Sequence, residues 1–251
     1  MHQFSKLQDL FHSINLHLVA EFEKFPVEKR EAINSNVVAE WLGEKSDQSI
    51  LGDVSVFGDF AWRTTYLMTA VSELRQVSSW ANSIPIRKLN ISTCEQIEFV
   101  WWLHFTKLGE FQDRLFKFYD SATKLVQGDV ERSEIVLTKR QFTKTFMSAL
   151  KGKIETRNFW VHDFKPDIAE LKRLSSLELF AKLYKSGSDS SDLSKLLLKE
   201  CRRVEKAERE RLKSILSQDQ IMVEKLADNV VVFVDKYIDF NFLNIVPLSK
   251  S

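Results

Sequence analysis

The chain has 251 residues and a mass of 29.3 kDa, and 44% of its residues are hydrophobic, which is enough to form a sizeable buried core. Its 36 Lys and Arg residues balance 35 Asp and Glu residues, giving a formal net charge of +1. Bulk charge therefore gives no sign of a nucleic-acid-binding or membrane-surface protein, and any such partner must bind a local patch.

The N-terminal part predicts helices separated by proline and glycine. With only 7 Gly and 4 Pro residues and little strand-like alternation, the sequence favours an all-α fold. A second, shorter helix should cover about 27–42 after Pro26, and residues 43–58, which hold three glycines, predict a surface loop or short hairpin. A further helix is expected at about 60–82. The first helix should pack through an apolar stripe formed by Phe4, Leu7, Leu10, Phe11, Ile14 and Leu18.

The segment from Ser92 to Gly128 predicts the central helix of a bundle. Ser92, Thr93, Cys94 and Glu95 form a capping-box sequence, in which the Ser92 hydroxyl and the Glu95 carboxylate satisfy two free amides. An apolar stripe runs along this helix, and so many aromatic residues flank it that two faces of the helix should be buried. His104, which lies on the stripe, is interpreted as a core or half-buried histidine with one hydrogen bond. The stripe consists of Val100, His104, Leu108, Phe111, Leu115, Phe118, Ala122 and Leu125.

Two further helices are expected at about 138–161 and 166–184, followed by the linker "KSGSDSSD" at 185–192. The segment beyond it predicts one or two long helices with a charged back, either a hairpin outside the bundle or a partner-binding arm. The sequence thus predicts a single all-α domain over 1–251, an up-and-down bundle with its core at about 60–185 and a C-terminal helical arm at about 192–245.

The sequence lacks the patterns that several kinds of site and segment require. Cys94 and Cys201 stand alone, which suits a reducing compartment and argues against disulfides and structural zinc. The N-terminus lacks the compact apolar core of a signal peptide, and no apolar run approaches the roughly 20 residues that span a bilayer. No phosphate-binding glycine loop, nucleophile elbow or metal-binding histidine spacing occurs. We therefore expect a cytoplasmic protein with no membrane, no metal and no cofactor.

The stretch "ETRNFWVHDFKPD", residues 155–167, carries the candidate catalytic residues Arg157, Asn158 and His162. Continuing the apolar stripe of this helix at its helical period would require an apolar residue at 157 or 158, yet both residues are polar. Asn158 and His162 are four residues apart, so the amide can orient the imidazole. Arginine suits a phosphate oxygen, and imidazole can move a proton near neutral pH. Together they could act on a phosphodiester without a metal. The stripe consists of Phe142, Phe146, Leu150, Ile154 and Val161.

The "RNFWVH" sequence at 157–162 resembles the R-x4-6-H signature of the HEPN superfamily, and the aromatic-rich helix at 93–127 is similar to the helix beside the motif in that group. The resemblance implies an all-helical, metal-independent endoribonuclease whose two motifs meet across a homodimer. It implies that Arg157 stabilises the phosphate, that His162 is the acid/base and that Asn158 orients it. Members include toxins and anti-phage effectors, so an antitoxin or defence-system partner is expected besides the RNA substrate.

One departure from the family pattern bears on regulation, and one alternative to the nuclease stays open. A subgroup of these toxins carries a regulatory tyrosine two residues after the histidine, where this chain has Phe164, so regulation by tyrosine modification is not expected. The chain could also be a non-catalytic helical module of the same fold that binds RNA or a protein. In that case Arg157 and His162 would make only structural hydrogen bonds, an idea supported by the near-zero net charge.

Overall fold

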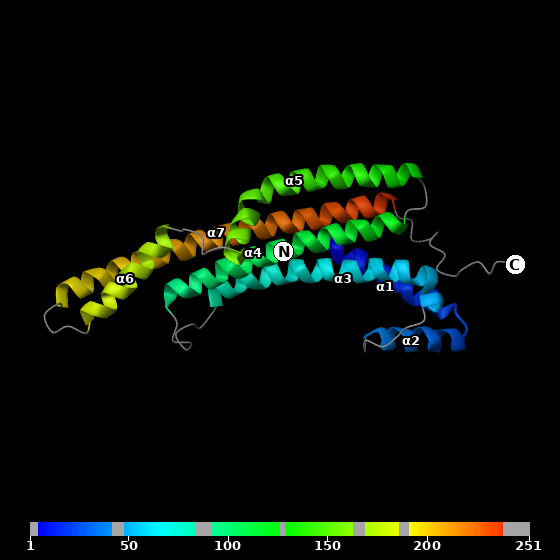
Figure 1. Cartoon of the computed structure of the whole chain (residues 1–251), viewed down its shortest axis with the longest axis horizontal. Helices are drawn as coiled ribbons and strands as arrows, with labels where there is room; N and C mark the ends of the chain where they lie inside the picture. Colours follow the sequence, from blue (N-terminus) through cyan, green and yellow to red (C-terminus); the bar gives the residue numbers. More distant parts are fainter. Residues whose placement is uncertain are drawn as a thin grey trace. The chain divides into compact units, whose positions relative to one another are not determined.

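A computed structural model describes residues 5–41, 48–83, 92–125, 129–162, 169–185 and 191–237, and of the helical residues 151–162 it describes the backbone alone. Within these ranges the chain is helical, without a single strand, and the predicted all-α class is confirmed. The seven helices, drawn in Figure 1, are α1 (Ser5–Glu23), α2 (Val27–Trp41), α3 (Gln48–Ser83), α4 (Thr93–Leu125), α5 (Asp129–His162), α6 (Ala169–Lys185) and α7 (Ser191–Tyr237).

The helices form two compact units. Unit 1 comprises residues 1–69, 113–145 and 224–251, and unit 2 comprises residues 70–112 and 146–223. The helices α3, α4, α5 and α7 each contribute residues to both units, because each of them continues through a unit boundary. The predicted single-domain organisation, with a core at about 60–185, stays a prediction.

Helix α3 begins earlier than the sequence indicates. The loop or hairpin predicted for 43–58 is wrong for residues 48–58, which form the first turns of α3. A glycine inside a helix costs about 1 kcal/mol relative to alanine, and neither Gly52 nor Gly58 stops this helix. A side chain added at Gly58 would meet nothing within 4 Å, so no close backbone approach demands glycine there.

The predicted capping box at the start of α4 is confirmed. The Ser92 amide donates to Glu95 Oε2 at 2.7 Å, and the Glu95 amide donates to Ser92 Oγ at 3.1 Å. The Thr93 amide donates to Glu178 Oε1 of α6 at 3.0 Å. Three backbone donors at this helix start are thereby satisfied by side chains, which fixes where α4 begins.

Helix α4 has the central position that its stripe predicts. Every residue of the predicted stripe from Val100 to Leu125 is buried, and Trp101, Phe105 and Tyr119 beside it are buried as well. In unit 1 α4 contacts α3 through the Phe60 and Phe118 rings, whose centroids lie 5.2 Å apart, and in unit 2 it contacts α3, α5, α6 and α7. A helix with four neighbours must bury most of its circumference, which explains its aromatic content.

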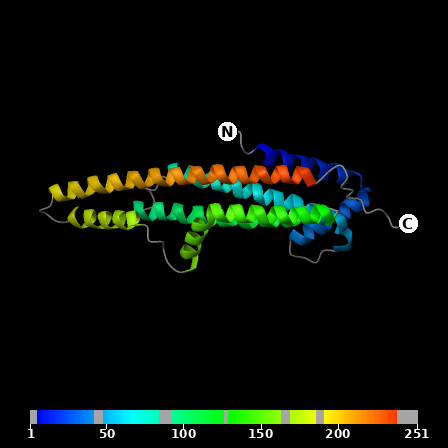
Figure 2. The same ribbon diagram turned by 90° about the horizontal axis from the view of Figure 1, so that it is seen from above.

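Helix α7 is one continuous helix of 47 residues. No glycine or proline interrupts residues 191–237, so nothing in this stretch favours a hairpin turn. In unit 2 it runs antiparallel to α6, with ion pairs from Arg173 to Glu200 and from Arg211 to Glu170 (Figure 2). Its apolar residues contribute to the cores of the units instead of forming a free arm; those buried are Val204, Leu212, Leu216, Val223, Ala227, Val230, Val231 and Val234.

Candidate functional site

The predicted catalytic residues Arg157, Asn158 and His162 lie in the last two turns of α5, which ends at His162 as the sequence indicates. Their side chains lie outside the described residues, so the predicted site is placed at the level of the backbone. On this continuous helix Asn158 and His162 are one turn apart on the same face, whereas Arg157 lies roughly 140° from His162 around the axis.

The part of α5 before the motif is anchored in the core of unit 2. Phe146 and Leu150 are fully buried, and Phe142 is half-buried in unit 1, so the stripe is confirmed up to residue 150. Ile154 and Val161, the last two members, fall outside the described side chains. The burial of Phe146 and Leu150 anchors this part of α5 in unit 2.

Two contacts join α5 to α4 in unit 2. The rings of Phe111 and Phe146 lie 5.9 Å apart, and Gln112 Nε2 donates to Met147 Sδ at 3.0 Å. Gln112 therefore supplies a polar contact from α4 to the motif helix. Since Met147 precedes Arg157 by ten residues, the anchored point lies almost three helical turns before the motif.

A second group of polar side chains lies between α4 and α7, also in unit 2. His104 Nε2 and Asp219 Oδ2 are 2.9 Å apart, and their side chains are only 2% and 3% exposed. The prediction of a core histidine with one hydrogen bond is confirmed for His104. The imidazole donates in this bond when its hydrogen is on Nε2, and a carboxylate oxygen of Asp219 then accepts.

The buried His104–Asp219 pair is suited to positioning helices. At 1% exposure His104 offers no atom to a substrate, and its Nδ1 is buried with no hydrogen-bond partner among the described residues. A buried histidine paired with a carboxylate resembles part of a catalytic triad, but no nucleophile is described next to it. The pair instead favours one register of α7 against α4, because sliding either helix would separate two buried polar side chains that are hydrogen-bonded in this register.

A second polar contact supports the same register. Arg209 Nη2 donates to Gln96 Oε1 at 3.3 Å, while its Nε donates to Glu205 Oε1 at 2.9 Å. Along α4 the residues run from 96 to 104 as their partners on α7 run from 209 to 219, so the two helices are parallel in unit 2. Sequence reasoning missed Asp219, which lies in the polar run "SQDQ" and gives no signal of burial.

The cysteines are poorly suited to nucleophilic chemistry. Cys94 Sγ is buried and donates to the Leu171 carbonyl at 3.2 Å. Burial raises the pKa of the Cys201 thiol, and the nearby Glu178 and Glu205 raise it further. A thiol that resists ionisation is a weak nucleophile. Within the described ranges no three His, Cys, Asp or Glu residues are grouped so that they could hold a metal ion, and no helix is long and apolar enough to cross a membrane.

Comparison of the chain with family models, with curated proteins and with solved structures gives no match.

Proposed function

We propose that the chain is a metal-independent endoribonuclease of HEPN type, with Arg157, Asn158 and His162 contributing half of an active site that a second copy completes. The observation that carries this proposal is the "RNFWVH" sequence in the last turns of a long helix, within an all-helical chain, where the stripe of that helix stops being apolar. A polar pair at a stripe position needs either a buried partner or an opening, and a cleft between two copies would supply the opening.

The proposed reaction is an attack by a ribose 2′-OH on the adjacent phosphorus. His162 takes the 2′-OH proton, the O2′–P bond forms, the P–O5′ bond breaks, and His162 returns a proton to the leaving 5′-oxygen. Arg157 offsets the charge on the equatorial phosphate oxygens, and Asn158 holds the imidazole in one orientation. The products are a 2′,3′-cyclic phosphate and a 5′-hydroxyl, and no step uses a metal ion.

The geometry of α5 is consistent with a composite site. Arg157 and His162 diverge around a single helix, so the two side chains of one copy need not reach the same phosphate. A two-fold axis next to the helix end would place the arginine of one copy beside the histidine of the other. The buried residues Phe146 and Leu150 hold the helix in place without occupying its last turns.

The test is cleavage of unlabelled RNA in EDTA by the wild-type protein, by His162→Ala and by Arg157→Ala. Matched controls are His12→Ala on α1 and Arg140→Ala on α5, which replace exposed residues of the same types. We expect the two motif variants to lose cleavage by at least a hundredfold while the controls retain it. Equal cleavage by His162→Ala and His12→Ala, or no cleavage by the wild-type protein, would contradict the proposal.

A non-catalytic binding module is the second candidate, and the exposed large side chains of the described residues favour it. Trp62, Trp80, Phe99 and Trp102 are each more than a third exposed, which is uncommon for large aromatic residues unless they meet a partner. Thermal melts separate the candidates. A structural role predicts clear destabilisation by Arg157→Ala and His162→Ala, whereas residues of a catalytic site usually tolerate truncation or become more stable.

A further inference from the structure

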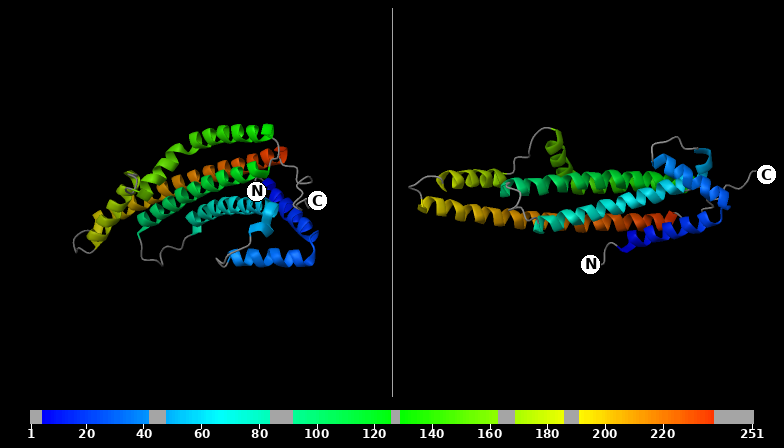
Figure 3. Two further views of the ribbon diagram at one scale, coloured as in Figure 1. Left: turned by 45° about the vertical axis from the view of Figure 1, so that its right-hand side comes forward. Right: turned by 90° about the horizontal axis from the view of Figure 1, so that it is seen from below.

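An exposed surface in unit 1 combines aromatic rings and cations from α3 and α4. We call it the aromatic–basic seam, and Figure 3 shows the two helices side by side. The helices are antiparallel here, since Asp59 of α3 contacts Ser121 of α4 while the carbonyl of Tyr66 contacts Arg114. The seam consists of Trp62, Arg63 and Tyr66 of α3 and Arg114, Lys117 and Lys124 of α4.

The aromatic half of the seam is ordered and open. The rings of Trp62 and Tyr66 lie 5.0 Å apart in an edge-to-face arrangement, and they are 47% and 38% exposed. Arg114 donates to the Tyr66 carbonyl at 3.1 Å, and its guanidinium lies over the Tyr66 ring at 5.7 Å from the centroid. Because these contacts hold the rings in place, the exposed indole can accept a flat partner at little entropic cost.

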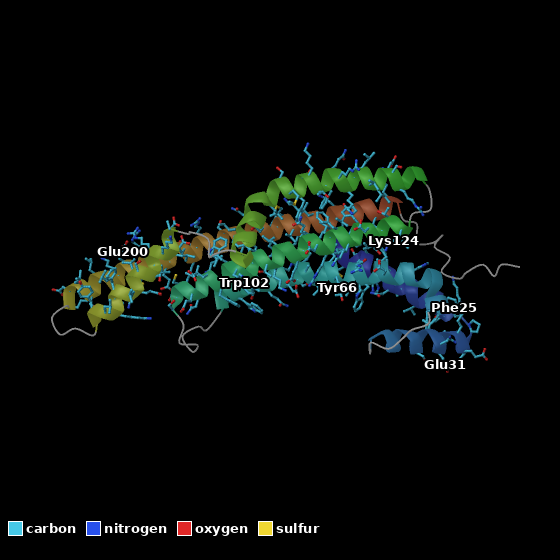
Figure 4. All side chains as sticks on the ribbon, in the orientation of Figure 1. Phe25, Glu31, Tyr66, Trp102, Lys124 and Glu200 are labelled. Atoms are coloured by element: carbon cyan, nitrogen blue, oxygen red, sulfur yellow. The ribbon has the colours of Figure 1, made fainter. Side chains whose placement is uncertain are left out.

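The basic half lies beside it on α4. Residues 114, 117, 121 and 124 fall on one face of the helix, and Ser121 of that face contacts α3. Lys117 is exposed, and the Lys124 side chain is 64% exposed (Figure 4). This row of cations is about 15 Å long, the length of about four stacked nucleotides.

Cations outnumber carboxylates on this surface. Arg63 and Lys124 both lie near Asp59, at 3.1 and 4.0 Å, so one carboxylate is shared between two cations. Asp113 and Asp120 are exposed carboxylates next to the row, and Asp120 is paired with Lys139. A partner that suits the seam therefore carries negative charges along a chain and presents flat rings.

We propose that the aromatic–basic seam binds single-stranded RNA, with a base stacked on the Trp62 indole and phosphates on Lys117, Lys124 and Arg114. Stacking on aromatic side chains with cations along the backbone is how single strands are bound without sequence preference. A duplex fits less well, because its bases are already stacked. This inference rests on the proposed function for the choice of RNA, and it adds a substrate-holding surface apart from the motif residues.

The test measures binding of a fluorescein-labelled 2′-O-methyl oligouridylate by anisotropy with the full-length protein. This probe has no free 2′-OH, so it cannot be cleaved by the proposed reaction. We expect Trp62→Ala to weaken binding about tenfold and Trp62→Phe to retain most of it. The matched control is Trp80→Ala, an equally exposed tryptophan elsewhere on α3, which should change binding less than about twofold.

The cations are tested by salt dependence. Replacing Lys117 and Lys124 together by alanine should reduce the slope of log K against log salt by about 1.4, since a single strand contributes roughly 0.7 for each neutralised phosphate. Replacing the exposed Lys213 and Lys225 of α7 should leave the slope unchanged. Equal binding by Trp62→Ala and Trp80→Ala, an unchanged slope, or equal affinity for a duplex overturns the seam proposal.

The two proposals can fail separately. If unmodified RNA is not cleaved but the probe binds in a Trp62-dependent way, the nuclease proposal fails and the seam stands. If cleavage requires His162 while Trp62→Ala leaves the binding of the probe unchanged, the seam proposal fails and the nuclease proposal stands. Melting curves of each variant confirm folding, which truncation of a half-exposed side chain should leave intact.

Discussion

Breaking the buried pair between His104 and Asp219 should destabilise the protein more than any surface change. The two side chains are 2% and 3% exposed and 2.9 Å apart, so Asp219→Leu leaves an imidazole buried without its partner, and His104→Phe leaves a buried carboxylate. Removing one member of such a pair costs about 3–5 kcal/mol. That is a large share of the roughly 5–15 kcal/mol that stabilises a typical domain.

The assay is urea and thermal unfolding of the wild-type protein, both single variants and the double variant. Each single variant should melt roughly 6–20 °C lower, at about 2–4 °C for each kcal/mol in a chain of this size. The double variant should recover much of the loss, because apolar residues of similar volume replace the whole pair. Glu210→Leu, on the exposed side of the same helix, should change the free energy of unfolding by less than about 0.5 kcal/mol.

Two results would refute the reasoning. If each single variant loses less than about 1 kcal/mol, the pair is not a significant link between α4 and α7. If the losses in the double variant simply add, the two side chains are not coupled, whatever their distance.

Three further predictions concern stability. Gly58→Ala should raise the free energy of unfolding by about 0.5–1 kcal/mol in urea denaturation, since the site is helical and open; a loss would mean that the added methyl group clashes. Ser92→Ala should cost about 1 kcal/mol through the lost cap of α4, and an unchanged urea midpoint would contradict the capping role. Burial raises the pKa of Tyr119 well above its usual value, so the folded state retains the proton that the unfolded state releases, and stability should fall as pH rises above about 10. Melting temperatures across that range should fall less for Tyr119→Phe than for the wild-type protein; an equal fall would assign the effect to other groups.

Local signals predicted much of the fold. The Ser92–Glu95 box defined the start of α4, and the apolar stripe identified its buried face. The end expected at about residue 161 agrees with the end of α5 at His162. Each of these features depends on residues a few positions apart along one helix. For that reason a single sequence contains them.

What the sequence failed to predict depends on residues far apart in the chain. Asp219 is 115 positions from His104, and it follows two exposed polar residues, Ser217 and Gln218, so nothing local indicates that it is buried. The helical start of α3 was missed because its glycines were taken as breaks, although the helix tolerates them. For the candidate site, the chemistry predicted for Arg157, Asn158 and His162 and the composite cleft both remain proposals.

The central position of α4 also has a consequence for synthesis on the ribosome. Its partners α5, α6 and α7 all follow it in the chain, and Asp219, which pairs with His104, is made late. At a synthesis rate of about 5–20 residues per second, roughly 5–20 s pass between the completion of α4 and the synthesis of Asp219. During that interval the nascent chain presents an apolar helix that only α3 can cover, so chaperone occupancy should be greatest on chains that end between α4 and the middle of α7.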